Sequence, residues 1–312
     1  MIHHVLKQAP EIEITHDTIS VILMGGIGNM MFQVAALMSH AKDHELRPVV
    51  GYWTNHQSEF AKFWNIFDKY GRNGHFDPWG GHQMKNPPIT LGDVFPKLPW
   101  FKGRPNAFDW WFDQSMSWEI DTGKGGIYHP IEDKLDPPGI VQGYFFNKEY
   151  WHHNREHLID IFTPDAGLEK WMDKHYGMLF EKNTISVHIR AGNRLDFIPP
   201  VQVPGKWIID TIAQIDEESN ILVFSDDLPA ARDFFYKTNI PRGRVFFIDE
   251  DQYMCMLLMA KCDKHILTNS TLSFWGAYLD VKQENPYTFL HETFFDSHPK
   301  EMIPYESWQI TS

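Results

Sequence analysis

The sequence predicts an α/β protein made of two Rossmann-like domains that face each other across a cleft. The main observation is an alternation of short apolar runs with amphipathic stretches, which is most regular after residue 183. Such alternation is typical of the strands and helices that build parallel sheets. Length is the second observation, because 312 residues are enough for about two domains, each with its own core.

The first half of the chain begins with a strand, a tight turn and a helix. Residues 18–24 (TISVILM) form an apolar run, residues 25–28 (GGIG) supply the turn, and residues 29–43 repeat apolar side chains at helical spacing. The further expectations for this half are a strand at 48–52, short helices and long loops at 71–138, a strand at 139–144 and a helix at 147–162.

The second half shows the alternation more clearly. We expect strands at residues 184–189, 220–225, 244–248 and 264–268, and helices at residues 204–216, 228–236, 251–261 and 271–279. The boundary between the halves falls within residues 163–183. This predicts an N-terminal domain over residues 1–165 and a C-terminal domain over residues 166–312.

Composition is that of an ordinary globular protein, and it narrows the function classes. The formal charge of −13 argues against a general nucleic-acid surface. Cys255 and Cys262 are too few for a disulfide framework, and their spacing on an apolar helix favours packing over a zinc or redox role. No run approaches the length of a membrane span and no signal-peptide pattern opens the chain, so the expected location is cytoplasmic.

A histidine and an arginine end the strand predicted at residues 184–189. Side chains alternate along a strand, so His188 and Arg190 point to one face at the carboxyl end of a parallel sheet. Phosphorylated ligands bind at that end, where Arg190 can hold a diphosphate and stabilise the charge that develops on it. The alternatives are an interdomain salt bridge for Arg190 and a core position for His188.

Small polar residues open the helix predicted at residues 271–279. Asn269, Ser270, Thr271 and Ser273 offer polar side chains and backbone N–H groups at a helix start. This arrangement suits phosphate binding without the lysine of a P-loop.

A second polar junction follows the strand predicted at residues 220–225. Asp226 and Asp227 can accept hydrogen bonds from ribose hydroxyls or from a base amine. Two acids before Leu-Pro are also an ordinary helix cap. The residues alone leave both interpretations open.

The glycine turn only partly matches a dinucleotide-binding fingerprint. The third glycine of G-x-G-x-x-G falls on Met31, and the second strand ends without the ribose-binding acid. A nicotinamide cofactor is therefore disfavoured. The glycines either serve the backbone geometry of a tight turn, with Asn29 as a helix cap, or face a ligand.

Five motifs, in the same order along the chain, resemble those of the α-1,2-fucosyltransferases (glycosyltransferase family 11). The motifs are GGIGNMMFQ at residues 25–33, QGYF at 142–145, HIRAGN at 188–193, FSDD at 224–227 and NSTLSFWGA at 269–277. The resemblance covers about residues 20 to 280, and the N-terminal tail and roughly the last thirty residues lie outside it.

The resemblance implies a GT-B-like enzyme that transfers L-fucose from GDP-β-L-fucose to a glycan hydroxyl in an α-1,2 linkage, with inversion and without a metal or other cofactor. The C-terminal domain would bind the nucleotide sugar and the N-terminal domain, which is rich in tryptophan, the acceptor. Arg190 would be the essential donor-phosphate arginine and His188 a nucleotide-site residue. Asn29 would approach the phosphate from the other domain, and Ser270 and Thr271 would hold the diphosphate; Ser273, Asp226 and Asp227 complete the expected donor site.

The chain departs from the family pattern at three positions. Ala191 replaces an arginine and Asn193 replaces an aspartate of the HxRRGD motif. The third departure is near Cys255, where the family commonly has an acid that is implicated in nucleotide recognition. Arg194 is the candidate to compensate for the first loss, and Glu250 or Asp251 for the last. Asp196, in the loop after Arg190, is the candidate base that deprotonates the acceptor.

These departures keep other functions open. One is a degenerate transferase that binds a sugar or nucleotide without catalysis, and another is a transferase that uses a different nucleotide sugar. An NAD-dependent oxidoreductase is the third, motivated by the glycine turn alone.

Overall fold

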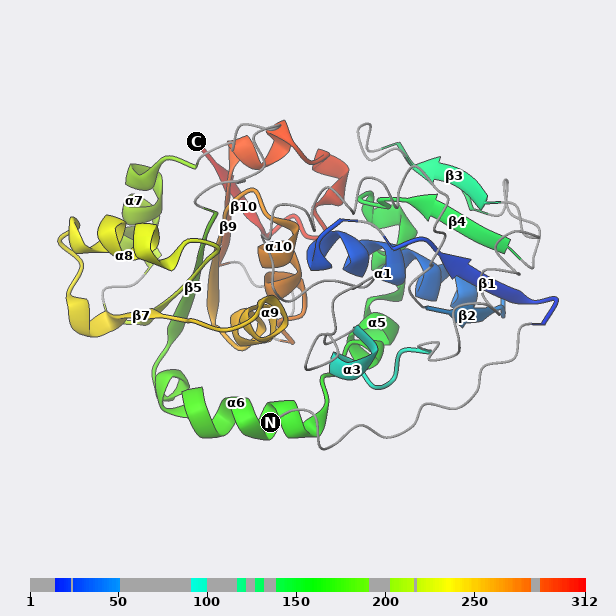
Figure 1. Cartoon of the computed structure of the whole chain (residues 1–312). Helices are drawn as coiled ribbons and strands as arrows, with labels where there is room; N and C mark the ends of the chain where they lie inside the picture. Colours follow the sequence, from blue (N-terminus) through cyan, green and yellow to red (C-terminus); the bar gives the residue numbers. More distant parts are fainter. Residues whose placement is uncertain are drawn as a thin grey trace, which may run out of the picture.

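The protein consists of two α/β lobes, which meet where helix α1 (Ile27–Asp43) of one lobe packs on helix α10 (Thr271–Tyr278) of the other (Figure 1). The computed structural model describes residues 15–23, 25–50, 91–99, 117–121, 127–131, 139–190, 203–215, 218–281 and 287–312. The region expected to hold short helices and long loops lies largely outside these residues. Trp100, Trp110 and Trp111, three of the tryptophans in the domain expected to bind the acceptor, also lie outside the described residues.

The described part of the N-terminal lobe contains four parallel strands in the order β2-β1-β4-β3. The elements of this lobe are β1 (Thr18–Val21), α1 (Ile27–Asp43), β2 (Arg47–Val49), α3 (Leu91–Val94), β3 (Ser117–Asp121), β4 (Gly139–Gly143), the 3-10 helices η2 (Lys148–Tyr150) and η3 (His152–Asn154), and α5 (Arg155–Ile161). The opening strand, turn, helix and strand are therefore confirmed.

The described part of the C-terminal lobe contains six parallel strands in the order β10-β9-β8-β5-β6-β7. Its elements are α6 (Ala166–Tyr176), η4 (Gly177–Glu181), β5 (Thr184–Ile189), α7 (Gly205–Ile215), β6 (Asn220–Ser225), α8 (Leu228–Tyr236), η5 (Arg242–Arg244), β7 (Val245–Phe247), α9 (Gln252–Ala260), β8 (Lys264–Leu267), α10 (Thr271–Tyr278), β9 (Thr288–His291), η6 (Glu292–Asp296), η7 (Lys300–Met302) and β10 (Gln309–Thr311). Two parallel sheets with crossover helices confirm the predicted pair of Rossmann-like units.

The C-terminal sheet buries both of its faces because side chains alternate along its strands. In β6, Ile221 and Val223 pack with residues of α7 and α8, whereas Leu222 and Phe224 belong to the larger core shared with α9 and α10. An α/β/α sandwich results, and the carboxyl ends of its strands are left to loops and helix starts.

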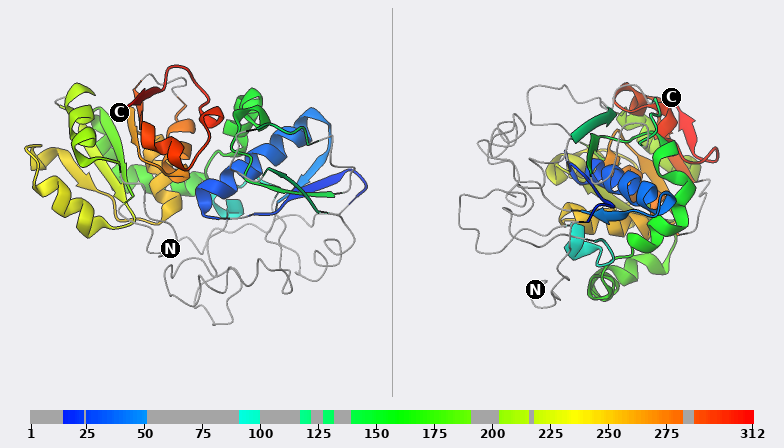
Figure 2. Two further views of the ribbon diagram at one scale, coloured as in Figure 1. Left: turned by 90° about the horizontal axis from the view of Figure 1, so that it is seen from above. Right: turned by 90° about the vertical axis from the view of Figure 1, so that its right-hand side faces the viewer.

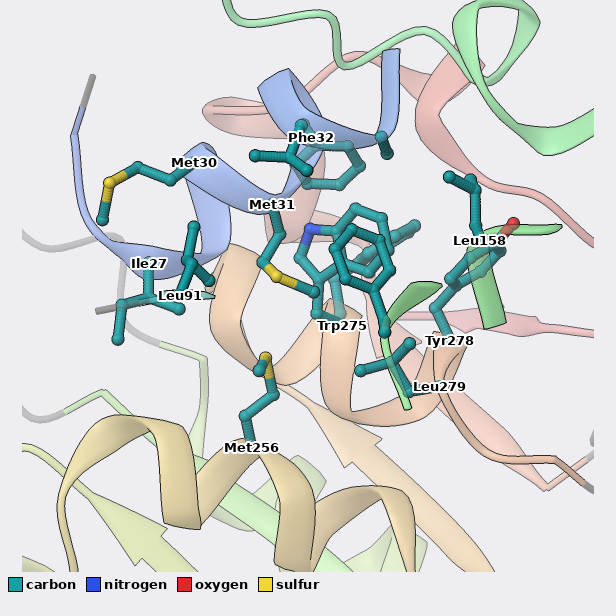
Figure 3. Close-up of a cluster of buried hydrophobic side chains, with 14 of the residues drawn as sticks. Ile27, Met30, Met31, Phe32, Leu91, Leu158, Met256, Trp275, Tyr278 and Leu279 are labelled. Atoms are coloured by element: carbon teal, nitrogen blue, oxygen red, sulfur yellow. The ribbon is translucent and has the colours of Figure 1, made fainter. Parts of the chain in front are cut away.

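The larger core crosses from one lobe to the other. Phe32 of α1 packs on Phe274 and Trp275 of α10, with ring centroids 5.0 and 4.9 Å apart. Figure 3 shows Met31 and Phe32 from α1 meeting Trp275 and Tyr278 from α10, with Met256 of α9 close by. The left view in Figure 2 shows α1 beside the C-terminal lobe, in agreement with its contacts to α10. The lobes therefore share one hydrophobic core at their contact, and this core fixes how their functional loops face each other.

The helix predicted at residues 147–162 is the main local correction. The structure divides it into two 3-10 turns and α5, because Trp151, between the two turns, has a non-helical backbone conformation with a φ of −148°. Its indole is fully buried and its Nε1 donates to the carbonyl oxygen of Phe145 at 3.1 Å. The tertiary anchoring of this side chain overrides the local helical pattern.

The predicted boundary region holds a helix, α6, which was not expected there. α6 runs along one side of the molecule from the N-terminal lobe to the C-terminal lobe (Figure 1). The division into domains at residue 165, and the role of each domain, stay predictions. No described helix is both long and apolar enough to cross a membrane.

Candidate active site

The first turn of α10 is organised by two buried serines. Ser270 is the N-cap, and its Oγ accepts from the backbone N–H of Leu272 at 3.3 Å. Ser273 Oγ donates to the carbonyl oxygen of Ser270 at 2.9 Å. Both side chains hold the helix start in shape, and Thr271 stands between them, half-buried.

Thr271 joins this helix start to the other lobe. Its Oγ1 donates to Oδ1 of Asn29, in the first turn of α1, at 2.9 Å. Gly28 lies directly against the same turn, because a Cβ at this position would overlap the backbone of Thr271 and come within 2.5 Å of the Leu272 nitrogen. The first turns of α1 and α10 therefore touch, and the donor-binding role expected of Asn29 stays a prediction.

This contact explains the glycine turn. Gly25 has a φ of +78°, which favours glycine, and Gly28 is needed for the close approach of the two helices. Gly26 is the N-cap of α1, without a side-chain cap. Asn29 is thus not the cap of its own helix; its side chain is used between the lobes.

His188 is buried at the end of β5 and carries no charge. Its Nδ1 lies 3.1 Å from Oγ1 of Thr268, which follows β8, so the pair ties two neighbouring strands at their carboxyl ends. Burial, with a further contribution from the charge of Arg190, lowers the pKa of His188 to about 3. The imidazole is therefore a neutral hydrogen-bonding group at physiological pH.

Arg190 follows directly, half-buried at the carboxyl end of β5. Its charge acts on two imidazoles, since it lowers the pKa of His188 and also that of His298. No carboxylate within the described part of the chain pairs with it. A cation that has no carboxylate partner among the described residues can receive an anionic ligand.

His298 was missed by the sequence analysis. It comes from the segment between η6 and η7, and its ring stacks on Phe294 at 4.5 Å and meets the edge of Phe146 at 5.5 Å. Phe146 follows the QGYF motif of the N-terminal lobe. No motif surrounds His298 in the sequence, and the packing of Phe146 and Phe294 around it places the imidazole where the charge of Arg190 acts on it.

The β6-to-α8 junction is organised locally. Asp227 is the N-cap of α8, and its Oδ1 accepts from the backbone N–H of Ala230 at 3.0 Å. Asp226 is exposed, and Ser225 lies in register with Ile189, so this junction shares the sheet edge of Arg190. The cap interpretation of Asp227 is confirmed; the donor-binding roles of both acids stay predictions.

Other candidates fall outside the described residues or have structural partners. Arg194 and Asp196 lie outside, as do the departures at Ala191 and Asn193, and their roles stay predictions. Asp251, one of the two acids proposed to compensate for Cys255, caps α9 by accepting from the N–H groups of Tyr253 and Met254.

The other compensating acid and the cysteines also have defined environments. Glu250 accepts a hydrogen bond of 2.6 Å from the hydroxyl of Tyr176. Cys255 and Cys262 are buried, as packing residues are, and burial raises the pKa of the Cys255 thiol to about 12. Across the described residues, no three His, Cys, Asp or Glu side chains are grouped so that they could hold a metal ion.

Comparison with protein families identifies the chain. The model of Glycosyl transferase family 11 matches residues 18–299. The chain belongs to this family. The match extends beyond the part where the resemblance was recognised from motifs, and it includes His298.

Two curated relatives come from Escherichia coli. An alpha-1,2-colitosyltransferase is 30% identical over 145 residues, which cover 44% of this chain and 50% of the relative. The O-antigen biosynthesis glycosyltransferase WbnK is 32% identical over 135 residues, which cover 40% of this chain and 44% of the relative. The chain thus spans about half the length of the curated relatives it matches.

Solved structures of fucosyltransferases show a more distant likeness. The fucosyltransferase NodZ from Bradyrhizobium has a TM-score of 0.47 and 12% identity, covering 84% of this chain and 93% of that one. Arabidopsis thaliana FUT1 in complex with GDP has a TM-score of 0.45 and 10% identity, covering 89% and 72% of the two chains.

Proposed function

We propose that this chain transfers L-fucose, or a related deoxyhexose such as colitose, from its GDP-linked form to a hydroxyl of a glycan and forms an α-1,2 linkage. Membership of family 11 supports the reaction class, and the name of the colitosyltransferase relative supports the sugar class and the linkage. The observation that carries the proposal is Arg190, a cation without a carboxylate partner in the described part of the chain, at the carboxyl end of β5.

The proposed reaction is a single displacement at the anomeric carbon. The acceptor oxygen attacks from the face opposite the diphosphate, the bond from that carbon to the phosphate oxygen breaks, and configuration inverts. Negative charge grows on the departing diphosphate, so the guanidinium of Arg190 stabilises the transition state more than the ground state. The positive end of the α10 dipole, held in place by Ser270 and Ser273, acts in the same direction.

The contact between the lobes gives the remaining donor residues their roles. Asn29 and Thr271 are hydrogen-bonded to each other across the lobes, so either can reach a diphosphate bound at the α10 start. His188, neutral and tied to Thr268, offers its second ring nitrogen to the nucleotide. In this proposal the C-terminal lobe binds the nucleotide sugar and the N-terminal lobe the acceptor, and no metal is required.

A thermal-shift screen across GDP-, UDP- and dTDP-sugars tests the donor, because a ligand at 100 times its Kd stabilises the folded state by about 2.7 kcal/mol. We expect stabilisation by GDP and GDP-fucose or GDP-colitose, followed by GDP release when glycan acceptors are added. Stabilisation by UDP- or dTDP-sugars alone would contradict the proposed donor. Donor binding without release with any acceptor would favour the degenerate binding protein, for which Ala191 and Asn193 are the motivation.

A further inference from the structure

His298 joins a segment of the C-terminal lobe to the N-terminal lobe, and the charge of the donor arginine acts on it. Its own segment follows η6, its ring contacts Phe146 of the N-terminal lobe, and Arg190 at the end of β5 lowers its pKa. Phe146 in turn packs edge-on against Phe32 of α1, with ring centroids 5.2 Å apart. The imidazole is therefore part of the contact between the two lobes.

The hydrogen bonds of this imidazole determine which of its two ring nitrogens carries the hydrogen. Nδ1 lies 3.1 Å from the carbonyl oxygen of Phe294, which can only accept, so Nδ1 carries the hydrogen in the neutral ring. Ser297 Oγ lies 3.0 Å from the same nitrogen. Nε2 then presents a lone pair, and no described residue is hydrogen-bonded to it. Stacking on Phe294 and the edge contact with Phe146 hold the plane of the ring.

We propose that Nε2 of His298 is the base that accepts the proton of the attacking acceptor hydroxyl; this inference rests on the proposed transferase function. As the acceptor oxygen bonds to the anomeric carbon, its O–H proton passes to Nε2, and the bond between that carbon and the diphosphate breaks with its electron pair on the leaving oxygen. One side of the site thus takes the proton while Arg190 takes the negative charge.

Donor binding makes this base stronger. In the free protein, burial and then the charge of Arg190 hold the pKa of His298 at about 4, with the Phe294 hydrogen bond acting in the opposite direction. A diphosphate bound at Arg190 brings negative charge that offsets the guanidinium. The pKa of His298 therefore rises when the donor is in place, which confines effective proton transfer to the loaded site.

The chain contains a matched control for this histidine. His175 of α6 also stacks on the aromatic residue four positions earlier, Trp171, at 4.1 Å, and its Nδ1 lies 2.8 Å from the Trp171 carbonyl oxygen. The local arrangement is the same, but His175 is exposed on α6. His175→Phe and His298→Phe therefore make the same chemical change in two different places.

The decisive experiment compares transfer kinetics of four variants with the wild type. Phenylalanine keeps the stacking of residue 298 and removes the lone pair, so we expect His298→Phe to lower kcat at least about 100-fold, with the donor KM within about threefold. His298→Gln, should the phenylalanine variant not fold, is expected to show the same fall. His175→Phe should stay within about twofold of the wild type. A kcat of His298→Phe near the wild-type value, or a large fall confined to Asp196→Asn, would overturn the proposal.

A second readout separates this inference from the proposed function. Nuclear magnetic resonance of labelled histidine side chains, with His298→Phe to assign the signal, measures the pKa of His298 with and without GDP. We expect a rise of at least about one unit with GDP in the wild type and none in Arg190→Ala. If the wild type transfers no sugar, the proposed function fails by itself. An unchanged pKa in the GDP-bound wild type overturns the role of His298.

Discussion

Two strand-to-helix junctions of the C-terminal lobe, β8 to α10 and β6 to α8, have the same kind of N-cap and different surroundings. Each begins with a small polar N-cap, Ser270 or Asp227, that accepts a backbone N–H of its own helix. At α10 the next residue, Thr271, is hydrogen-bonded to Asn29 of the other lobe. The cap at α8 has a partner within its own first turn, Ala230. Equal local patterns therefore acquire different roles through what the fold places against them.

The two junctions also rest on different hydrophobic cores. The core around α1, α9 and α10 is rich in aromatic and methionine side chains and crosses the lobes, with Phe32, Trp151 and Trp275 in mutual contact. The core under α7 and α8 is smaller, mostly aliphatic and contained in one lobe. Substitutions at the junction should change both stability and transfer, whereas those under α8 should act mainly on stability.

The largest effect is expected at Arg190. Arg190→Ala removes the cation that stabilises the leaving diphosphate, and we expect kcat/KM to fall by about 10²–10³-fold or more. The melting temperature should hardly change, because the side chain is half-buried and has no carboxylate partner among the described residues. Transfer assays and calorimetry check this. Activity of Arg190→Ala within about threefold of the wild type would contradict a role of the junction between the lobes in transfer.

The close approach of α1 and α10 predicts a steric effect at Gly28. Gly28→Ala places a methyl group on the backbone of Thr271, and we expect a loss of about 1–3 kcal/mol in the free energy of unfolding together with reduced transfer. Gly26→Ala is the matched control, because a Cβ there has no neighbour within 4 Å. Equal denaturation midpoints for the two variants would show that the helices do not touch as described.

Burial of His188 predicts that the free energy of unfolding depends on pH. Its folded pKa of about 3 is below the ordinary value of 6.5, so between these values the unfolded chain binds a proton that the folded chain does not. Its contribution to stability is complete above about pH 6.5 and is lost as pH falls towards 3. From pH 7 to pH 5 we expect the wild type to lose about 2 kcal/mol more than His188→Asn does. Parallel denaturation curves for the two proteins would contradict a neutral buried imidazole.

The smallest effect concerns the α8 cap. Asp227→Ala should lower the free energy of unfolding by about 1 kcal/mol, and Asp227→Ser should restore it because serine also caps helices. The serine variant isolates the donor-binding role expected of the carboxylate, so its donor KM should rise while its melting temperature stays at the wild-type value. An unchanged donor KM of Asp227→Ser would show that Asp227 caps α8 and does not bind the donor.

Much of the fold was predictable because its signals are local. Residues 184–189 and 220–225 were expected as strands and are β5 and β6, and residues 228–236 were expected as a helix and are α8. The helix expected at residues 147–162 failed because the burial of Trp151 overrides periodicity. β9 and β10 were not foreseen, since the last part of the chain carries no regular alternation.

The site was predictable only where its geometry is also local. The shared face of His188 and Arg190 follows from strand alternation, and the Ser270 cap follows from residue type. The bond between Asn29 and Thr271 joins residues 242 positions apart, and no pattern in the residues themselves indicates it. The position of His298 depends on the packing of Phe146 and Phe294 around it, which only the folded chain supplies.

The most direct test of the account is a crystal structure of the protein with GDP bound. We expect the diphosphate within hydrogen-bonding distance of the Arg190 guanidinium, at the start of α10 and close to Asn29. A diphosphate bound elsewhere, or an Arg190 side chain held in a buried ion pair away from the nucleotide, would contradict it.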